Sequence, residues 1–410
     1  MTVEYREKIR EYIEQNHAAQ VRFLAELVKV PSDNPPGDCA AHATRAAELL
    51  EQLGFTVERH PVPAEVVRAH GMISVTNLIV RRRFGPGPVI ALNAHGDVVP
   101  PGEGWSADPY GAEIRNGTMY GRGVAVSKSD FATYAFALKA LEASGLPLRG
   151  TVELHFTYDE EMGGQVGPAW LLEQQLTKPD YVISASFSYN VVIAHNGCLH
   201  LEVRIEGRSA HAARPDTGVD ALEAATKLLA SLYSLRETYK QTRSKVSGID
   251  HPTLVVGLIN GGINTNVVPD LVTLRIDRRI IPEEVPEQVE RDLVAHIERV
   301  CSSFEGIKVS IRRILLARPF TPQTGQDKLV AILQRHGRAI MGEDIPANGV
   351  PIYTDARLYS AAGIPTVLYG AGPHTLLEAN GHRADEKLML DDLRKATQVI
   401  ANTLADLLAE

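Results

Sequence analysis

Residues 89–100 read VIALNAHGDVVP, an apolar run rich in β-branched residues that ends in histidine, glycine and aspartate. A second run, VELHFTY at residues 152–158, leads into three consecutive acidic residues. Residues 131–144, between the two runs, have the apolar spacing of a helix. Short buried strands that alternate with helices are typical of a largely parallel α/β sheet. We therefore expect polar side chains just beyond strand ends, where open α/β sheets bind ligands.

The pattern of elements changes after Cys198. Residues 199–314 predict the order strand, helix, strand, strand, helix, strand, which is that of a ferredoxin-like module. The α/β pattern resumes after Pro319 with a further helix, a strand and a closing helix. We therefore expect a discontinuous catalytic domain, residues 1–196 and 316–410, interrupted by a second domain at residues 197–315.

Length and composition exclude several classes of protein. A chain of 410 residues exceeds the about 250–300 residues at which single cores stop growing, so we expect two cores. No apolar run reaches the roughly 18 residues of a membrane span. With 42 Lys and Arg against 50 Asp and Glu, the charge argues against nucleic acid and for a small-molecule substrate. The charged opening, MTVEYREKIREYIEQN, lacks the apolar core of a secretory signal, which predicts a cytoplasmic protein.

Three polar segments carry side chains suited to metal-assisted hydrolysis. His95 and Asp97 follow the first apolar run, and a carboxylate can fix the ring of a metal-binding histidine. Glu160 and Glu161 follow the second run, where one carboxylate would bind a metal ion while its neighbour takes a proton from water. His382 lies in the third segment. Each segment alone is also compatible with a structural role: a hydrogen-bonded core histidine, a solvated acidic turn and a loop histidine.

In combination, these segments resemble the family of co-catalytic zinc hydrolases that includes acetylornithine deacetylase, succinyl-diaminopimelate desuccinylase, aminoacylase and carboxypeptidase G. The resemblance covers nearly the whole chain and implies a zinc-exopeptidase-like catalytic domain with a mostly parallel sheet. It also implies that the inserted domain is a lid through which two chains form a homodimer. The matching residues, in order, are HGDVVP (95–100), Trp105, Asp108, Pro109, YGRG (120–123), Lys128, DEE (159–161), Gly163, Gly164, Gly207, His211, Pro215, Gly261, Gly262, Asn266, Pro269, Asp277, Arg279, GIP (363–365), His382 and Glu386.

The resemblance also implies a role for each residue of the catalytic domain. His95, Glu161 and His382 would be metal ligands. Glu160 would be the general base that activates water, and Asp97 the carboxylate that supports His95. The implied reaction is hydrolysis of an amide or related C–N bond in a small substrate that carries a carboxylate.

Residues of the inserted domain would complete the site. By resemblance, His211, Asn266 and Arg279 approach the carbonyl or carboxylate of the substrate, with His211 reaching across the dimer. Arg279 and Arg357 are candidates to anchor the substrate carboxylate, and structural ion pairs are the alternative for both. We predict no membrane or nucleic-acid partner.

Two positions depart from the family pattern. Val126 stands where relatives carry the aspartate that bridges two metals, and Ser186 stands where a second acidic ligand follows the strand DYVISA, residues 180–185. An isopropyl group cannot ligate, and a serine hydroxyl is a poor substitute for a carboxylate. Two histidines, one glutamate and water suffice for a single catalytic zinc. We therefore expect one divalent ion per chain: zinc, manganese or cobalt.

Asp130 is a candidate to compensate for Val126, because it lies one helical turn further along the chain. Its carboxylate is either a replacement ligand or a partner of the helix dipole. A second hypothesis for the whole protein is a metal-poor relative that keeps the site as a binding module or for different chemistry, since fold alone does not fix function. Retention of Glu160 beside Glu161 favours the hydrolase.

Overall fold

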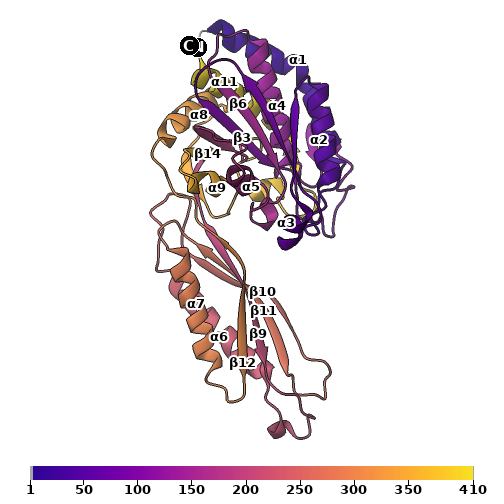
Figure 1. Cartoon of the computed structure of the whole chain (residues 1–410), viewed down its shortest axis with the longest axis vertical. Helices are drawn as coiled ribbons and strands as arrows, with labels where there is room; N and C mark the ends of the chain where they lie inside the picture. The colour runs from indigo at the N-terminus through magenta and orange to yellow at the C-terminus, as the bar shows by residue number, and fades with distance from the viewer. Residues whose placement is uncertain (1–2, 410) are drawn as a thin grey trace. The chain divides into compact units, whose positions relative to one another are not determined.

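The computed structural model describes residues 3–409 and divides them into two compact units (Figure 1). Unit 2 contains Ala194–Thr321 and Gly349–Tyr353, and unit 1 contains the rest of the chain. The inserted unit therefore begins slightly before the predicted residue 197 and ends slightly after the predicted residue 315. It also takes in the short segment Gly349–Tyr353, which the local sequence pattern did not assign to it.

The core of unit 1 is an eight-stranded sheet in the order β1-β2-β6-β3-β7-β14-β8-β13. The central strands β6, β3, β7 and β14 are parallel, whereas β1, β2 and β8 pair antiparallel. The α/β prediction is confirmed, and the sheet is mixed. Its edge strand β1 alternates between more and less buried residues, a pattern typical of antiparallel strands. The strands are β1 (Val57–Pro61), β2 (Thr76–Arg83), β3 (Val89–His95), β6 (Thr151–Thr157), β7 (Tyr181–Ser184), β8 (Val191–His195), β13 (Ala347–Val350) and β14 (Thr366–Leu368).

Helices flank this sheet, and α4 is the most buried of them (Figure 1). Apolar residues surround α4 on all sides, and it packs against α1 and α11, as expected for a helix inside a large core. The longer helices are α1 (Val3–Val28), α2 (Ala40–Gln52), α4 (Lys128–Ala143), α8 (Gln326–Met341) and α11 (Leu390–Leu408). Shorter elements are α3 (Ala64–Ala69), α5 (Pro168–Glu173), α9 (Ala356–Ala361), α10 (Leu376–Ala379) and a small sheet of β4 (Glu113–Arg115), β5 (Thr118–Tyr120) and β15 (Lys387–Met389).

Unit 2 is an antiparallel sheet in the order β10-β11-β9-β12, with two helices along one face (Figure 1). This order and the chain sequence βαββαβ are those of a ferredoxin-like module. Strand β11 begins at Leu271, just after Pro269, which has no amide hydrogen to donate to a ladder. The elements are β9 (Gly197–Glu206), α6 (Ala221–Tyr239), β10 (Thr253–Gly261), β11 (Leu271–Ile280), α7 (Pro286–Cys301) and β12 (Lys308–Ala317).

Across residues 3–409, every helix is too short or too polar to cross a lipid bilayer. The three cysteines, Cys39, Cys198 and Cys301, are buried free thiols.

Candidate metal centre

His95 is the last residue of β3, and its buried ring is fixed by Asp97, two residues further on. The ring Nδ1 lies 3.0 Å from the backbone oxygen of Asp97, to which it donates, and 3.5 Å from the carboxylate Oδ1. A histidine held at one nitrogen presents the other to a metal ion. The geometry therefore directs Nε2 of His95 towards Glu160, whose Oε2 is 3.9 Å away.

The carboxylate of Asp97 also holds the acidic turn that follows β6. Its Oδ1 accepts the amide of Glu160 and its Oδ2 accepts the amide of Glu161, both at 3.2 Å. Oδ2 also accepts a 2.9 Å hydrogen bond from Nδ2 of Asn34. The sequence reasoning missed Asn34, whose signal was its place in the proline-rich stretch PSDNPPGD, residues 31–38. Asp97 thus links the end of β3 to the turn that carries the predicted base and ligand.

The predicted metal ligands and the predicted base meet at this point. His95, Glu160 and Glu161 each offer one ligand atom, and these atoms lie within 4.8 Å of one another. The Nε2 of His382 lies 3.4 Å from Oε1 of Glu161, from a loop position with positive φ (62°). The two imidazoles and the carboxylate of Glu161 form a donor set that suits zinc and similar divalent ions, and Glu160 lies beside them. The residues present therefore fit a divalent metal.

The electrostatics of the cluster also favour a divalent metal. Burial raises the pKa of Glu160 to about 8, with Glu161 and Asp97 adding to the shift against the pull of His95. Burial disfavours the charged form of His95, but Glu160 and the other carboxylates outweigh it and hold its pKa well above the ordinary value. The hydrogen bond with Glu161 raises the pKa of His382. Crowded carboxylates that retain protons in this way would release them to a bound cation.

A buried glutamate shapes the loop that passes beside the cluster. The Oε2 of Glu386 accepts hydrogen bonds from Nη1 of Arg122 at 2.6 Å and from the amide of Gly123 at 3.1 Å. Its Oε1 accepts the amides of Ala125 at 3.0 Å and Val126 at 3.1 Å. Glu386 and Arg122 are each 1% exposed. One carboxylate therefore fixes the backbone of the loop that carries Val126.

Asp130, the candidate replacement metal ligand, instead accepts a hydrogen bond from the backbone of a distant segment. Its side chain is fully buried in the first turn of α4, and Oδ1 accepts the amide of Ala371 at 2.8 Å. The carboxylate packs so closely on Gly370 that no Cβ would fit there. Burial raises the pKa of Asp130 well above the ordinary value. Asp130 thus holds the segment after β14, and it is absent from the group of converging ligand atoms found among the described residues.

Arg357 also has a local partner. It is buried on α9, and its Nη2 donates to the backbone oxygen of Gly163, directly after the acidic turn. This contact supports the glycine-rich turn that positions Glu161. This hydrogen bond is a structural contact of one guanidinium nitrogen, and an additional role of Arg357 as anchor of a substrate carboxylate stays a prediction.

In unit 2, the three residues predicted to contact the substrate separate into two places. His211 and Asn266 are exposed neighbours, because the amide of Ala212 donates to the backbone oxygen of Asn266 at 3.0 Å. Arg279 pairs with Asp277 at 3.0 Å and lies opposite the start of β9. The ladder between β9 and β11 puts Arg279 at the other end of the sheet. One chain's unit 2 thus does not bring Arg279 and His211 together.

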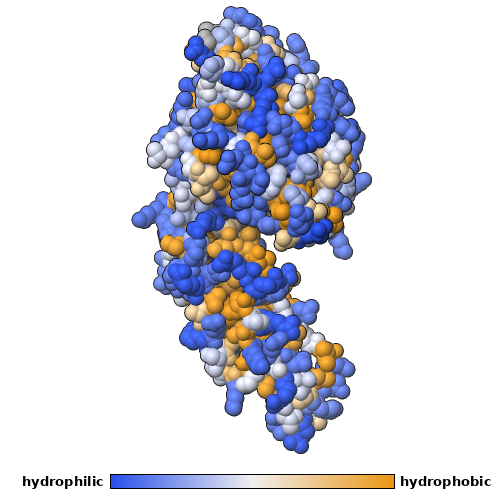
Figure 2. Space-filling model, viewed as in Figure 1, coloured by the Kyte–Doolittle hydropathy of each residue, from blue (hydrophilic) through white to orange (hydrophobic). Residues whose placement is uncertain are grey.

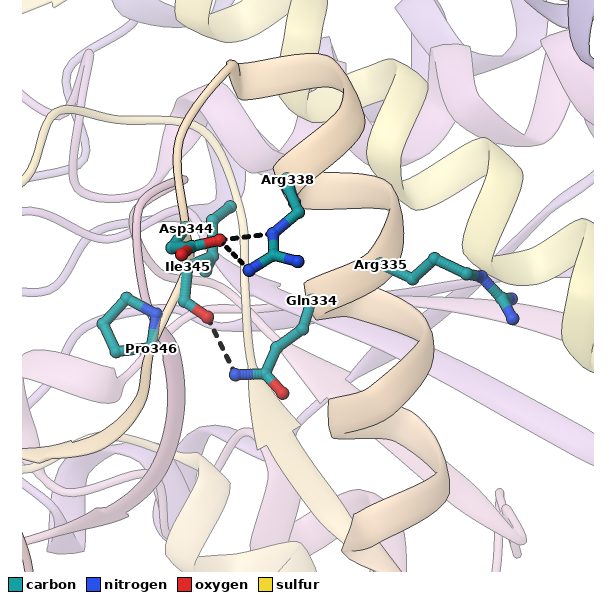
Figure 3. A pocket seen from close by; sticks show the side chains of 6 residues that line it. All are labelled: Gln334, Arg335, Arg338, Asp344, Ile345 and Pro346. Carbon is teal, nitrogen blue, oxygen red and sulfur yellow. Dashed lines mark hydrogen bonds and ion pairs between the residues drawn. The ribbon is translucent and has the colours of Figure 1, made fainter.

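A pocket of about 720 Å³ lies elsewhere in unit 1, beside α8 (Figure 3). Its arginines are already paired, Arg338 with Asp344 and Arg335 with Asp406. The Nε2 of Gln334 donates to the backbone oxygen of Ile345 at 2.8 Å. None of the candidate site residues lines this pocket, so it does not compete with the metal centre as the site of chemistry.

Comparison with known proteins gives the same identification as the site geometry. Residues 91–406 match the model of peptidase family M20/M25/M40. The chain is 29% identical to succinyl-diaminopimelate desuccinylase of Sphingopyxis alaskensis over 394 residues, which cover 94% of this chain and 97% of the relative. It is 29% identical to acetylornithine deacetylase of Proteus mirabilis over 329 residues, or 80% of each chain.

Solved structures show the same fold. The dipeptidase Dug1p of Saccharomyces cerevisiae superposes with a TM-score of 0.78 at 15% identity over 98% of both chains. An M20 family metallo-carboxypeptidase of Sulfolobus solfataricus gives a TM-score of 0.77 at 18% identity, over 94% of this chain and 98% of that one. The family match spans both units and includes the strand ends that bring histidine and glutamate together. The chain therefore belongs to peptidase family M20/M25/M40, as a metallohydrolase that acts on carbon–nitrogen bonds.

Proposed function

We propose that the chain hydrolyses an amide or related C–N bond in a small substrate that bears a carboxylate, using one divalent ion of zinc, manganese or cobalt. His95, Glu161 and His382 would hold the ion, and Glu160 would be the general base. The observation that carries the proposal is the convergence of all four side chains on a turn whose two amides are hydrogen-bonded to Asp97.

The chemistry follows from this arrangement. Bound between these ligands, a divalent ion polarises the substrate carbonyl and lowers the pKa of water. Glu160 is adjacent to a ligand without being needed as one, so its carboxylate is available to take a proton from the attacking water. It then delivers that proton to the leaving nitrogen. A bound cation favours the deprotonated form of Glu160, which is the form that acts as a base.

The count of one ion rests on charge. Two catalytic metals lie about 3.5–4 Å apart, and two dications at that distance repel strongly unless carboxylates lie between them. Here Val126 and Ser186 supply no charge, and the carboxylate of Asp130 is hydrogen-bonded to Ala371. A second ion would therefore be repelled by the first, with no negative charge from positions 126 and 186 to offset the repulsion.

Metal stoichiometry tests this count. Protein purified without chelator should contain about one divalent ion per chain, and removal of that ion should abolish hydrolysis of N-acylated amino acids. The variant Val126→Asp with Ser186→Glu should bind close to two ions, because both substitutions restore charged oxygen ligands. Native mass spectrometry under matched zinc loading gives both values.

The neutral variant Val126→Asn with Ser186→Gln is the matched control, and it should stay at one ion because its amides carry no charge. A parent chain that binds two ions tightly would contradict the single-ion proposal. A parent that binds none and hydrolyses nothing would leave the binding module as the better hypothesis.

The proposal includes a homodimer through unit 2, with His211 supplied to the partner's site. Strand β10 is an edge of the sheet, and four large apolar residues on or just after it are 52–78% exposed: Val255, Leu258, Ile259 and Ile263. Figure 2 shows hydrophobic side chains gathered on the visible face of unit 2. An apolar edge strand invites pairing with another chain, and a second copy is the usual partner.

A charge on this edge should break the dimer. Ile259→Lys places an ammonium group where an apolar residue would be covered, so sedimentation velocity at micromolar concentration should show a monomer with reduced activity. Ile314→Lys is the matched control, because Ile314 is 39% exposed on β12, the opposite edge of the same sheet. A parent chain that sediments as a fully active monomer would contradict the dimer.

A further inference from the structure

The segment Ser32–Asn34 lies alongside Gly96–Val98, directly after the end of β3. The Oγ of Ser32 donates to the backbone oxygen of Gly96 at 2.6 Å, and the amide of Val98 donates to the backbone oxygen of Ser32 at 3.0 Å. The amide of Asn34 donates to the backbone oxygen of Val98 at 2.8 Å. These contacts fix the backbone of Asn34 beside Asp97 independently of its side chain.

The side chain of Asn34 then has a single reasonable orientation. It is 2% exposed, and Nδ2 donates to Oδ2 of Asp97 at 2.9 Å and to Sδ of Met72 at 3.6 Å. The reverse amide orientation would turn Oδ1 towards the carboxylate of Asp97, oxygen against oxygen. In the observed orientation Oδ1 has no hydrogen-bond partner among the described residues. The contact with Asp97 is thus the principal polar contact of this side chain.

We propose that Asn34 is a positioning residue for the metal centre, acting through Asp97; the proposal rests on the proposed function of His95 and Glu161 as metal ligands. Asp97 is fully buried and must satisfy its oxygens locally. Its two other close donors, the amides of Glu160 and Glu161, belong to the very turn that Asp97 positions. Asn34 supplies a side-chain donor at 2.9 Å from a segment whose backbone is fixed separately.

Loss of the Asn34 donor would affect both His95 and Glu161. Without the Nδ2 donor, the carboxylate of Asp97 can rotate towards the amides of the turn and away from Nδ1 of His95, 3.5 Å from its Oδ1. That rotation shifts the turn that carries Glu161 and removes the carboxylate from beside the His95 ring, which is then held by the backbone oxygen of Asp97 alone. Loss of a group that orients metal ligands typically weakens metal binding by about 10–100-fold.

Zinc affinity tests the proposal without relying on catalysis. The dissociation constant of zinc is measured by competition with a chromophoric chelator for the full chain, for Asn34→Leu and for Asn34→Ser. Leucine keeps the volume of the side chain, and serine is small enough to fold where leucine would not fit. Both variants should bind zinc about tenfold or more weakly, with the circular dichroism of the parent.

Asn402 provides the matched control, because it is a buried asparagine on α11 whose Oδ1 also lacks a hydrogen-bond partner. Asn402→Leu and Asn402→Ser should change Tm by similar amounts and leave zinc affinity unchanged. The proposal is overturned if the Asn34 variants bind zinc like the parent, if the Asn402 variants lose affinity equally, or if only the Asn34 variants fail to fold. His95→Ala in the same titration separates the two ideas, because unchanged zinc affinity there would overturn the ligand assignment itself.

Discussion

Glu160→Gln should lower kcat by about a thousandfold while the bound metal remains. A general base typically contributes about 10²–10⁴-fold, and glutamine cannot accept the proton of the attacking water. The substitution keeps the backbone amide of Glu160, which donates to Oδ1 of Asp97 at 3.2 Å, so the turn should keep its shape. The side chain of glutamine also has the size of the one it replaces. The loss should therefore appear in kcat rather than in folding.

The measurement pairs steady-state kinetics on an N-acylated amino acid with metal analysis of the same sample. Glu173→Gln is the matched control, because Glu173 is an exposed carboxylate on α5 in the same unit. It should leave kcat unchanged. Activity of Glu160→Gln within about tenfold of the parent would remove Glu160 from the role of base. Loss of metal together with activity would show that Glu160 is a ligand.

Glu386→Ala should destabilise unit 1 by about 3–5 kcal/mol, the usual cost of removing one partner from a buried ion pair. The guanidinium of Arg122 would be left buried with its charge unpaired, although its Nη2 keeps the backbone oxygen of Pro101 at 3.1 Å. The amides of Gly123, Ala125 and Val126 would also lose their acceptor. Unpaired buried groups of this kind are among the mechanisms that give single substitutions large effects on stability.

Urea unfolding followed by tryptophan fluorescence measures this loss, since Trp105 and Trp170 both lie in unit 1 and the guanidinium of Arg122 is 5.3 Å from the Trp105 ring. Glu113→Ala is the control, because Glu113 forms an exposed pair with Arg115 in the nearby small sheet and such pairs contribute little. Equal stability of the Glu386 and Glu113 variants would contradict the role assigned to Glu386.

Local sequence pattern was sufficient to predict the strand ends that carry the chemistry. The buried run at residues 89–94 leads into polar residues at the carboxyl end of a strand, which is where open α/β sheets bind ligands. His95, Glu160, Glu161 and His382 were found in this way together with the family resemblance, and the structure brings them into one cluster. The family, the α/β fold and the class of enzyme were confirmed by the comparisons.

The contacts that orient these residues could not be predicted from the local sequence pattern. Asn34 and Asp97 are 63 positions apart, and Asp130 and Ala371 are 241 apart. No periodicity of strand or helix specifies which distant backbone amide a buried carboxylate will meet. The same reason applies to Arg357, whose sequence context fits a substrate anchor as well as it fits the hydrogen bond to Gly163 that the structure shows.

The hydrogen bonds from the loop before α4 to Glu386 have an evolutionary consequence. The carboxylate holds backbone amides, including that of Val126, so the path of the loop does not depend on which side chain stands at position 126. A ligand at this position can be lost or regained by one codon change without rebuilding the scaffold. Evolution can therefore exchange the side chain at position 126 while the protein still folds, because the backbone contacts that shape the loop do not involve that side chain.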